Sequence, residues 1–525
     1  MSEALDGAVK PRMLGLALVL AVVFWWLGRF LPYDDNANPA AACLVLAVTA
    51  LTTTCWLTGA MPIGAASLLP IALFPLLGVQ STAQVTQAYT NPILWLFGGG
   101  FVLAKAIERW GLHRRLALQV VRRIGAHPRR LVLGFMLVAT FLSLWISNTA
   151  TALMLLPIGW ALVERAQAMG TMSPRTARNF AAAVMLAIAY GASIGGMGSP
   201  IGTAPNALFL KNYQSLVDAG APAISFLQWI VCFAPYAFLL AIVFSWVLSS
   251  VVMRIPRGAL AGGEDMIAEA SKLPAMSKAE RRVGTLFAIT VLLWVTRADV
   301  RISEDFVIHG WAYWISPTAT AANPRFVHDA VVAVGAAIAA FLIPAGVASG
   351  GKVERLMNWE TAKTVPFDIL FLLGAGMAMA DAFEPTGLSR ALGHLVGPLV
   401  GTTHPLVVIG VLALVMLVLS EVASNTACAA VFLPILKEAA IAARVDPRLL
   451  MIPAALAASC GFMLPIATPP NTIVFASGKV SVGQMARAGF VLDIMAIGML
   501  VAVLWIWVLP LLGIDPAVTP EWLPK

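Results

Sequence analysis

The sequence is short of charged residues. Asp, Glu, Lys and Arg make up 11% of its 525 residues, whereas hydrophobic residues make up 60%. Soluble domains carry about 25% charged residues, so this composition excludes a soluble protein and indicates a membrane protein. Backbone groups inside a bilayer must bond to one another, which allows only helices or a closed barrel. Because the apolar runs are long and lack period-two alternation, we predict an all-α polytopic membrane protein.

Cysteine and histidine are also scarce. Neither the five cysteines nor the six histidines show the spacing of a disulfide framework or a metal site. The cysteines, all within hydrophobic segments, are Cys43, Cys55, Cys232, Cys428 and Cys460. No nucleophile–base pair stands at membrane depth, so we expect no enzyme. The formal net charge of +8 comes from basic residues in loops beside hydrophobic runs, which indicates cytoplasmic loops and not a nucleic-acid partner.

Eleven apolar segments are each long enough to be expected as a membrane-spanning helix. They lie at residues 13–32, 39–58, 61–78, 91–108, 179–210, 226–252, 283–297, 328–345, 366–384, 447–477 and 486–512. Two further apolar stretches, 131–163 and 405–437, contain polar residues near their middles. A straight helix of that length would measure about 50 Å, too long for a hydrocarbon core of about 30 Å. We therefore expect each of the two stretches to fold as a re-entrant helical hairpin.

Basic residues predict the orientation of the chain. The segment 105–130 contains eight of them and 254–282 contains six, so both segments are expected in the cytoplasm. They are Lys105, Arg109, Arg114, Arg115, Arg122, Arg123, Arg129 and Arg130, and Arg254, Arg257, Lys272, Lys278, Arg281 and Arg282. Eleven spans and two hairpins then place the N-terminus in the cytoplasm and the C-terminus outside. The start of the chain lacks a signal-peptide cleavage pattern, so the first apolar run is expected to be retained.

The chain contains an internal repeat. ILWLFGGG from Ile93 and ILFLLGAG from Ile369 match at an offset of 276 residues. The hairpin segments SLWISNTATALMLLP, from Ser143, and SEVASNTACAAVFLP, from Ser420, follow at an offset of 277. Each hairpin precedes a span interrupted by Gly and Pro. An old duplication with ordinary kinks is the alternative, but repeated polar triplets at hairpin tips favour inverted repeats, which mark the binding site of a transporter.

The tips of such hairpins suit ion binding. A helix N-terminus exposes unpaired N–H groups and about half a positive charge, which attract an anion. Helix C-termini and unwound backbone present carbonyl oxygens, which suit Na⁺. An Asn amide offers an oxygen to a cation and an NH₂ group to a carboxylate. Neither of the two quoted segments, 143–157 and 420–434, contains Lys or Arg, so an anion at the tips would depend on dipoles, hydroxyls, amides and bound cations. A divalent anion would enter only at high cost without Na⁺.

The two Ser-Asn-Thr motifs, each in a hairpin followed by a broken span, resemble the divalent anion/sodium symporter family. The resemblance covers about residues 13–512. It implies a homodimer in the membrane, in which a transport domain moves like an elevator against a scaffold domain. It also implies five parts: N-terminal scaffold helices (13–90), a first inverted repeat (91–212), central scaffold helices with a cytoplasmic loop (226–345), a second inverted repeat (366–480) and a C-terminal helix (486–512).

The same resemblance implies which residues bind the ions. Sodium site 1 would use Ser143, Ser147, Asn148 and Gly196, and sodium site 2 would use Ser420, Ala423, Asn425 and Ala467. The substrate carboxylates would meet Asn148, Thr149, Asn425 and Thr426, and Thr468 and Pro469 would line the same pocket. Met197 stands where a small or hydroxyl residue is expected, and Ser199 could substitute for it. Glu421 is either a proton-coupling carboxylate or a brace of its hairpin, and we favour the brace. We expect Asp493 to lie near the end of its span.

These expectations lead to one function with alternatives of the same fold. We expect a sodium-coupled symporter, with Na⁺ as coupling ion and no organic cofactor, that imports C4-dicarboxylates such as succinate, malate or fumarate. A sodium-independent dicarboxylate exchanger, or a transporter of citrate or sulfate, is the alternative. Intact triplets at both tips favour the symporter. The composition suggests a multi-pass protein of a bacterial inner membrane.

Overall fold

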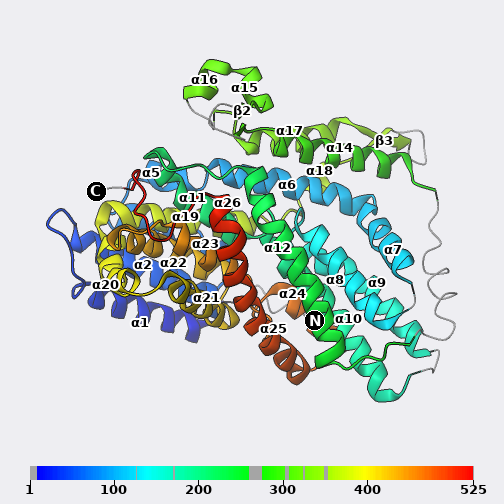
Figure 1. The fold of residues 1–525 in the computed structure, drawn as a ribbon. Coiled ribbons are helices and arrows are strands. Elements are labelled where there is room, and N and C mark those ends of the chain that lie inside the picture. The colour runs from blue at the N-terminus through cyan, green and yellow to red at the C-terminus, as the bar shows by residue number, and fades with distance from the viewer. Residues whose placement is uncertain are drawn as a thin grey trace.

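The computed structural model is a bundle of helices (Figure 1), and the residues that it describes also form two small strand pairs. It describes residues 9–125, 127–168, 172–258, 275–301, 307–322, 326–347 and 353–523. Lys272 of the expected basic loop lies outside these residues. The strand pairs are antiparallel, β1 with β2 and β3 with β4. An all-α architecture is therefore confirmed.

The first half of the chain forms helices close to the expected segments. They are α1 (Pro11–Gly28), α2 (Pro39–Thr58), α3 (Ile63–Ala66), α4 (Leu69–Leu76), α5 (Thr82–Ala88), α6 (Pro92–Arg109), α7 (Leu112–Ile124), α8 (Pro128–Ser143), α9 (Asn148–Ala168), α10 (Pro174–Met197), α11 (Ala204–Asp218) and α12 (Phe226–Val247), which continues into the π-helical turn η1 (Leu248–Val252). Proline often stands in the first turn, where its missing N–H is not needed.

The second half begins with a helical pair joined by small strands. Its elements are α14 (Lys278–Val295), β1 (Val300–Arg301), β2 (Val307–Ile308), α15 (Trp311–Ile315), α16 (Pro317–Ala322), α17 (Asp329–Leu342), β3 (Pro344–Val347), β4 (Val353–Arg355), α18 (Trp359–Ala362), α19 (Phe367–Thr386), α20 (Leu388–Thr402), α21 (Pro405–Val422), α22 (Asn425–Ala442), α23 (Arg448–Ala457), α24 (Pro469–Ala476), α25 (Val482–Val503), η2 (Leu504–Val508) and α26 (Leu509–Leu511).

Several of these helices can cross a membrane by themselves. Within the described part of the chain, seven helices are long and apolar enough, or eight if the bent pair of α5 and α6 is one span. Other expected spans are shorter, such as α17, or broken, such as α3 with α4. An integral membrane protein is thus confirmed, and the count of eleven crossings stays a prediction.

Glycine ends the first long helix of both repeats. Gly111 follows α6 and Gly387 follows α19, with φ of 70° and 78°. Because this left-handed conformation is strained for residues with a Cβ, glycine is the residue that can turn the chain here. The chain then enters α7 in one half and α20 in the other. The two glycines are 276 positions apart, which is the offset of the repeat.

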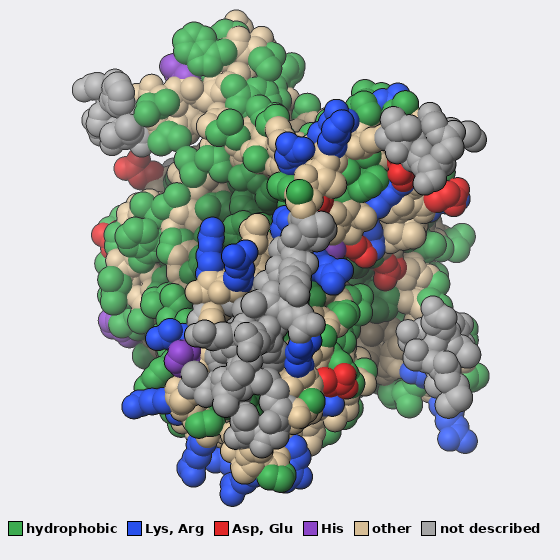
Figure 2. Space-filling view, turned by 90° about the vertical axis from the view of Figure 1, so that its right-hand side faces the viewer, with side chains coloured by type: hydrophobic (Ala, Val, Ile, Leu, Met, Phe, Trp, Pro, Cys, Tyr) green, Lys and Arg blue, Asp and Glu red, His purple; other side chains and the backbone are tan. Residues whose placement is uncertain are grey.

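Basic side chains gather on one face of the molecule (Figure 2). Helix α7 lies on this side, on the right of Figure 1, and exposes Arg114, Arg122 and Arg123. Arg115 is buried and donates to both carboxylate oxygens of Glu280, at 2.8 and 3.1 Å. These hydrogen bonds lower the pKa of Glu280. They tie α7 to the start of α14, so the basic helix is held against the bundle.

Both expected hairpins and both expected breaks are present as local structure. A turn at residues 144–147 joins α8 to α9, and Ala423 with Ser424 joins α21 to α22. The first broken span stops at Met197 and resumes at Ala204, and the second stops at Ala457 and resumes at Pro469. Helix α10 is fully buried over its apolar length. It positions the first hairpin, because Gly195 lets the Thr140 carbonyl of α8 come within 2.2 Å of where a Cβ would stand.

Candidate functional site

The tip of the first hairpin contacts the break of α10 through one amide. Ser143 Oγ lies 2.7 Å from an amide atom of Asn148. When the amide nitrogen takes that position, it also donates to the carbonyl oxygens of Ala192 and Gly202, at 3.1 and 3.2 Å. A methyl group on Gly196 would stand 2.5 Å from the same amide. The structure thus brings Ser143, Asn148 and Gly196 together.

The rest of this tip is the start of α9. Ser147 Oγ accepts from the backbone N–H of Ala150 at 3.3 Å, so Ser147 caps the helix. Ser147, Asn148 and Thr149 are all half-buried. The first turn of α9 therefore presents free N–H groups and a hydroxyl beside the Asn148 amide, which suits an anion.

The second tip contacts its own break through Ser420. Ser420 is fully buried, and its carbonyl oxygen lies 3.4 Å from where a Cβ on Gly461 would stand. The Cβ of Ala467 lies 3.2 Å from the same point, so Ser420 and Ala467 meet at this glycine. Asn425 Oδ1 is buried and has no hydrogen-bond donor among the described residues. Ala423 is extended and half-buried, between Ser420 and Asn425.

The two residues expected to line the substrate pocket from the second break differ in burial. Thr468 is buried, caps α24 and accepts from the Asn471 N–H at 3.3 Å. Pro469 follows it and is exposed. Thr426 lies on the first turn of α22 and is 9% exposed. No hydrogen bond joins the two tips to each other in the described part of the chain, and each tip is instead attached to the break of its own half.

The two halves interlock around the breaks. Helix α9 packs on α24 and α11 packs on α22, so the second arm of each hairpin contacts the post-break helix of the other half. Lys479 Nζ lies 4.6 Å from the ring of Trp160, and Lys437 Nζ donates to Ser215 Oγ at 3.1 Å. Trp160 and Lys437 are 277 positions apart, the hairpin offset. The broken spans also meet, where Tyr190 donates to the Phe462 carbonyl at 2.9 Å.

The interpretation of Glu421 as a brace is confirmed. Its carboxylate accepts from the backbone N–H groups of Met463 and Leu464, at 2.8 and 3.0 Å. These residues lie in the second break, so Glu421 ties the hairpin to the unwound segment. The expectation for Asp493 was wrong. It lies within α25, is 3% exposed, and faces Glu421, because α25 packs against α21 of the hairpin.

Met197 and Ser199 of the first break contact other parts of the fold. The Met197 side chain is fully buried, with its sulfur 3.8 Å from Cys460 Sγ. Its carbonyl accepts from the Trp229 indole at 3.1 Å. The Ser199 hydroxyl donates to the Leu144 carbonyl of the hairpin turn. Met197 therefore fills the contact between the two breaks, and Ser199 fastens the first break to its hairpin.

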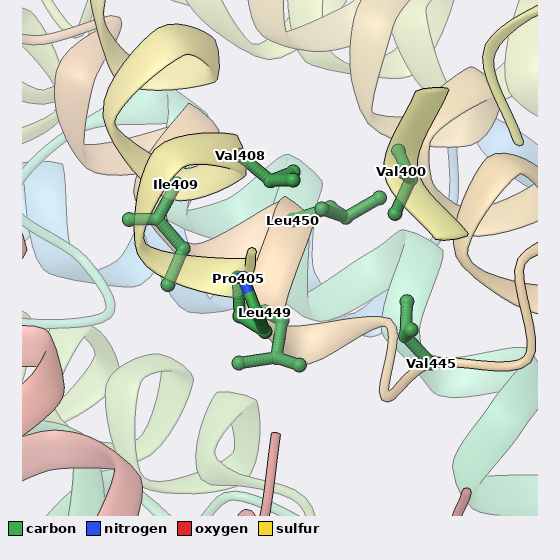
Figure 3. Close-up of a pocket in the computed structure, with 7 residues that line it drawn as sticks. All are labelled: Val400, Pro405, Val408, Ile409, Val445, Leu449 and Leu450. Carbon is green, nitrogen blue, oxygen red and sulfur yellow. The ribbon is translucent and has the colours of Figure 1, made fainter. Parts of the chain in front are cut away.

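Two cavities lie away from the tips. Figure 3 shows an apolar one between α20, α21 and α23, lined by Val400, Pro405, Val408, Ile409, Val445, Leu449 and Leu450. A charged one lies between α11, α19 and α22 and contains Lys211 and Lys437. Their ammonium groups bind Asp381 and Glu384, at 2.9 and 3.2 Å. Lys437 follows Asn425 by twelve residues, about 18 Å along the helix, so the lysines are separate from the tip.

At the first tip, hydroxyl, amide and carbonyl groups thus meet beside an unwound break, and at the second tip Ser420 and Ala467 meet at Gly461 of the other break. Among the described residues there is no cluster of three His, Cys, Asp or Glu for a transition metal. A family model described as the sodium:sulfate symporter transmembrane region matches residues 12–514. The chain belongs to this family. It is the divalent anion/sodium symporter family that the paired motifs predicted, so the resemblance is confirmed.

Relatives from this symporter family match over nearly the whole chain. The sodium-dependent dicarboxylate transporter SdcS of Staphylococcus saprophyticus is 37% identical over 503 residues, covering 95% of this chain and 92% of the relative. SdcS of Staphylococcus aureus strain USA300 is 37% identical over 508 residues, with 96% and 92% covered. The crystal structure of the Alcanivorax borkumensis YdaH transporter has a similar fold, with a TM-score of 0.54 at 13% identity over 94% of this chain and 96% of that one.

Proposed function

We propose that the protein is a sodium-coupled symporter that imports C4-dicarboxylates such as succinate, malate or fumarate. Two similar proteins of the same family carry the name sodium-dependent dicarboxylate transporter, at 37% identity. The observation that carries the proposal is the pairing of each Ser-Asn-Thr tip with an unwound break. Such a pairing offers carbonyl and amide oxygens to a cation next to helix N–H groups for an anion. A transporter of this kind needs no catalytic residue.

The proposed sodium sites follow the contacts of each half. In site 1, Ser143, Ser147 and Asn148 act with the backbone of Gly196. In site 2, Ser420, Ala423, Asn425 and Ala467 surround Gly461. The support is local: Asn148 touches Gly196, and Gly461 touches both Ser420 and Ala467. Oxygen ligands of this kind suit Na⁺.

The substrate is proposed to bind between the sodium sites. Asn148, Thr149, Asn425 and Thr426 donate to its carboxylates from the tips, and Thr468 and Pro469 line the same place. Lys211 and Lys437, the lysines of the charged cavity, are already paired with carboxylates. Two negative charges therefore lack a basic partner and depend on Na⁺, since an uncompensated charge in a low dielectric is costly. This dependence is the proposed physical basis of coupling.

The protein is further proposed to work as a homodimer with a moving transport domain. The tips, the breaks and α10 move together as the transport domain of a homodimer, past the scaffold helices. The interlocking of α9 with α24 and of α11 with α22 supports one rigid body. Import is into a bacterial cell across its inner membrane. The family description names sulfate, so citrate or sulfate transport, and dicarboxylate exchange without sodium, are the alternatives that an uptake assay must distinguish.

Labelled succinate is expected to enter proteoliposomes only when Na⁺ is present outside. The purified protein would be reconstituted, and uptake measured with an inward Na⁺ gradient and with choline in its place. Unlabelled fumarate, citrate and sulfate serve as competitors. Uptake that persists in choline but needs internal dicarboxylate would identify an exchanger. Competition by sulfate with no competition by fumarate would contradict the proposed substrate.

The proposed orientation predicts opposite labelling of the two ends. Arg122 on α7 and Ala517 near the C-terminus are exposed, whereas all five native cysteines are buried. In otherwise unchanged protein, Arg122→Cys should react with an impermeant maleimide only from the cytoplasmic side of membrane vesicles. Ala517→Cys should react only from the outer side. Protein without either substitution is the control. Labelling of both cysteines from the same side would exclude an odd number of membrane crossings between residues 122 and 517.

A further inference from the structure

Each break is followed by a Pro-Asn pair that opens the next helix. Asn206 is the third residue of α11, and Asn471 is the third residue of α24. The two asparagines are 265 positions apart, and so are Gly196 and Gly461. Both side chains are fully buried. They therefore occupy equivalent places in the two halves, beside the glycines that contact the hairpins.

Asn206 binds backward to the unwound segment that precedes it. Its Nδ2 donates to the carbonyl oxygens of Gly196 and Ser199, at 3.0 and 2.8 Å. The Met197 carbonyl lies at 3.5 Å from the same nitrogen. One amide group of α11 thus holds a carbonyl from the last turn of α10 and a carbonyl of the unwound segment, where regular helix hydrogen bonds end.

Asn471 makes the same pair of contacts in the second half. Its Nδ2 donates to the carbonyl oxygens of Gly461 and Leu464, at 3.2 and 3.0 Å. Leu464 is 265 positions after Ser199, so the partners are equivalent as well. The residues between the two acceptors differ, Met197 and Gly198 in the first half and Phe462 and Met463 in the second. The contact is therefore repeated although the sequence that it holds is not.

The NH₂ group is the part of each side chain that the fold uses. Asn206 Oδ1 and Asn471 Oδ1 are buried without a hydrogen-bond donor among the described residues. A carbonyl oxygen has two lone pairs, so the Gly196 carbonyl can accept from Asn206 and still bind a cation. We propose that Asn206 and Asn471 are positioning residues for the two sodium sites, which hold the carbonyls of the unwound breaks in place for Na⁺. This inference rests on the proposed function.

The test compares three asparagines in purified protein and in proteoliposomes. Asn206→Ala and Asn471→Ala remove the two donors, whereas Asn212→Ala is the matched control. Asn212 lies on α11, is 8% exposed and donates to the helical carbonyl of Leu208 at 2.8 Å, away from the break. The half-saturating Na⁺ concentration is measured in two ways, from the rise of Tm with added Na⁺ and from the Na⁺ dependence of succinate uptake. The rise of Tm reports binding to the folded state without transport.

Loss of the amide is expected to weaken the binding of Na⁺ more than the binding of succinate. Half-saturating Na⁺ should rise at least about tenfold in both assays for Asn206→Ala and Asn471→Ala, because each loses two buried hydrogen bonds. The KM for succinate at saturating Na⁺ should change less than about threefold, and Asn212→Ala should resemble the wild type. A lower Tm with unchanged half-saturating Na⁺ would mean a merely structural role and would overturn the inference.

Aspartate distinguishes the amide nitrogen from the amide oxygen. Asn206→Asp and Asn471→Asp keep the shape and an oxygen but replace the donors by acceptors facing carbonyls, so the Na⁺ response should be weakened further. A tighter Na⁺ response would make the oxygen a ligand and would overturn the inference. Asn→Ser variants, with one donor, serve if alanine variants do not fold, and should be intermediate. A wild type without any Na⁺ response overturns the proposed function itself, whereas unchanged variants beside a responsive wild type overturn only this inference.

Discussion

Replacement of Asn148 by alanine is expected to abolish sodium-driven succinate uptake while the protein stays folded. The Asn148 amide contacts Ser143 on the hairpin and reaches the Ala192 and Gly202 carbonyls of the first broken span. It also touches Gly196. In the proposed site the amide serves both the cation and the anion, so one substitution removes a ligand from each. A loss of about 3 kcal/mol or more corresponds to a rate reduction of at least about 100-fold.

The measurement is initial uptake into proteoliposomes at saturating Na⁺, with folding checked by gel filtration and Tm. Asn212→Ala is the matched control, since Asn212 lies on α11 and donates within that helix to the Leu208 carbonyl at 2.8 Å, away from the tip. It should keep near-normal uptake. Asn425→Ala should fail like Asn148→Ala, since Asn425 occupies the same place in the second tip. Near-normal transport by either tip variant would refute the site assignment.

Gly196→Ala is expected to block transport almost as completely, although it adds only one methyl group. Its Cβ would stand 2.5 Å from the Asn148 amide, a distance that requires the amide or the break to move. Helix α10, which contains Gly196, is fully buried over its apolar length, so there is little room for the break to shift. Overpacking of this kind costs about 1–3 kcal/mol, and the displaced amide would weaken Na⁺ binding roughly tenfold or more.

The control for this substitution is another helical glycine. Gly335 lies on α17, where an added Cβ would meet nothing within 4 Å. Gly335→Ala should leave uptake unchanged and slightly raise Tm, because alanine favours a helix by about 1 kcal/mol. Half-saturating Na⁺ and maximal uptake are measured for both variants. If Gly196→Ala binds Na⁺ as the wild type does, the contact between Gly196 and Asn148 plays no part in site 1.

Much of the architecture could be predicted because its signals are local. Helix lengths, the turn inside each polar triplet segment and the interruptions by Gly and Pro all depend on residues close together in the chain. Ser143, Asn148 and Gly196 were expected together, and the structure brings them into contact. The repeat helped here, since a pattern found twice at one offset carries more information than either copy.

Other features could not be predicted, because they depend on which helices pack together. Asp493 looked like a residue near the end of a span, yet α25 packs so that it faces Glu421, 72 positions earlier in the chain. Met197 looked like a change in the binding pocket, yet its side chain contacts Cys460 of the other half. The Pro-Asn pairs were visible in the sequence, but nothing in them indicated that each amide binds the preceding break.

The sequence by itself therefore determined the class of the molecule, its repeated halves and the residues at its tips. Composition and local spacing are sufficient for these, because a bilayer forces apolar runs into helices and leaves polar residues few places. Only the tertiary structure decided how the halves interlock, with α9 on α24 and α11 on α22, and how Glu421, Asn206 and Asn471 hold the breaks. The physical reason is that unwound backbone must find hydrogen-bond partners wherever packing brings them, and no local pattern specifies that place.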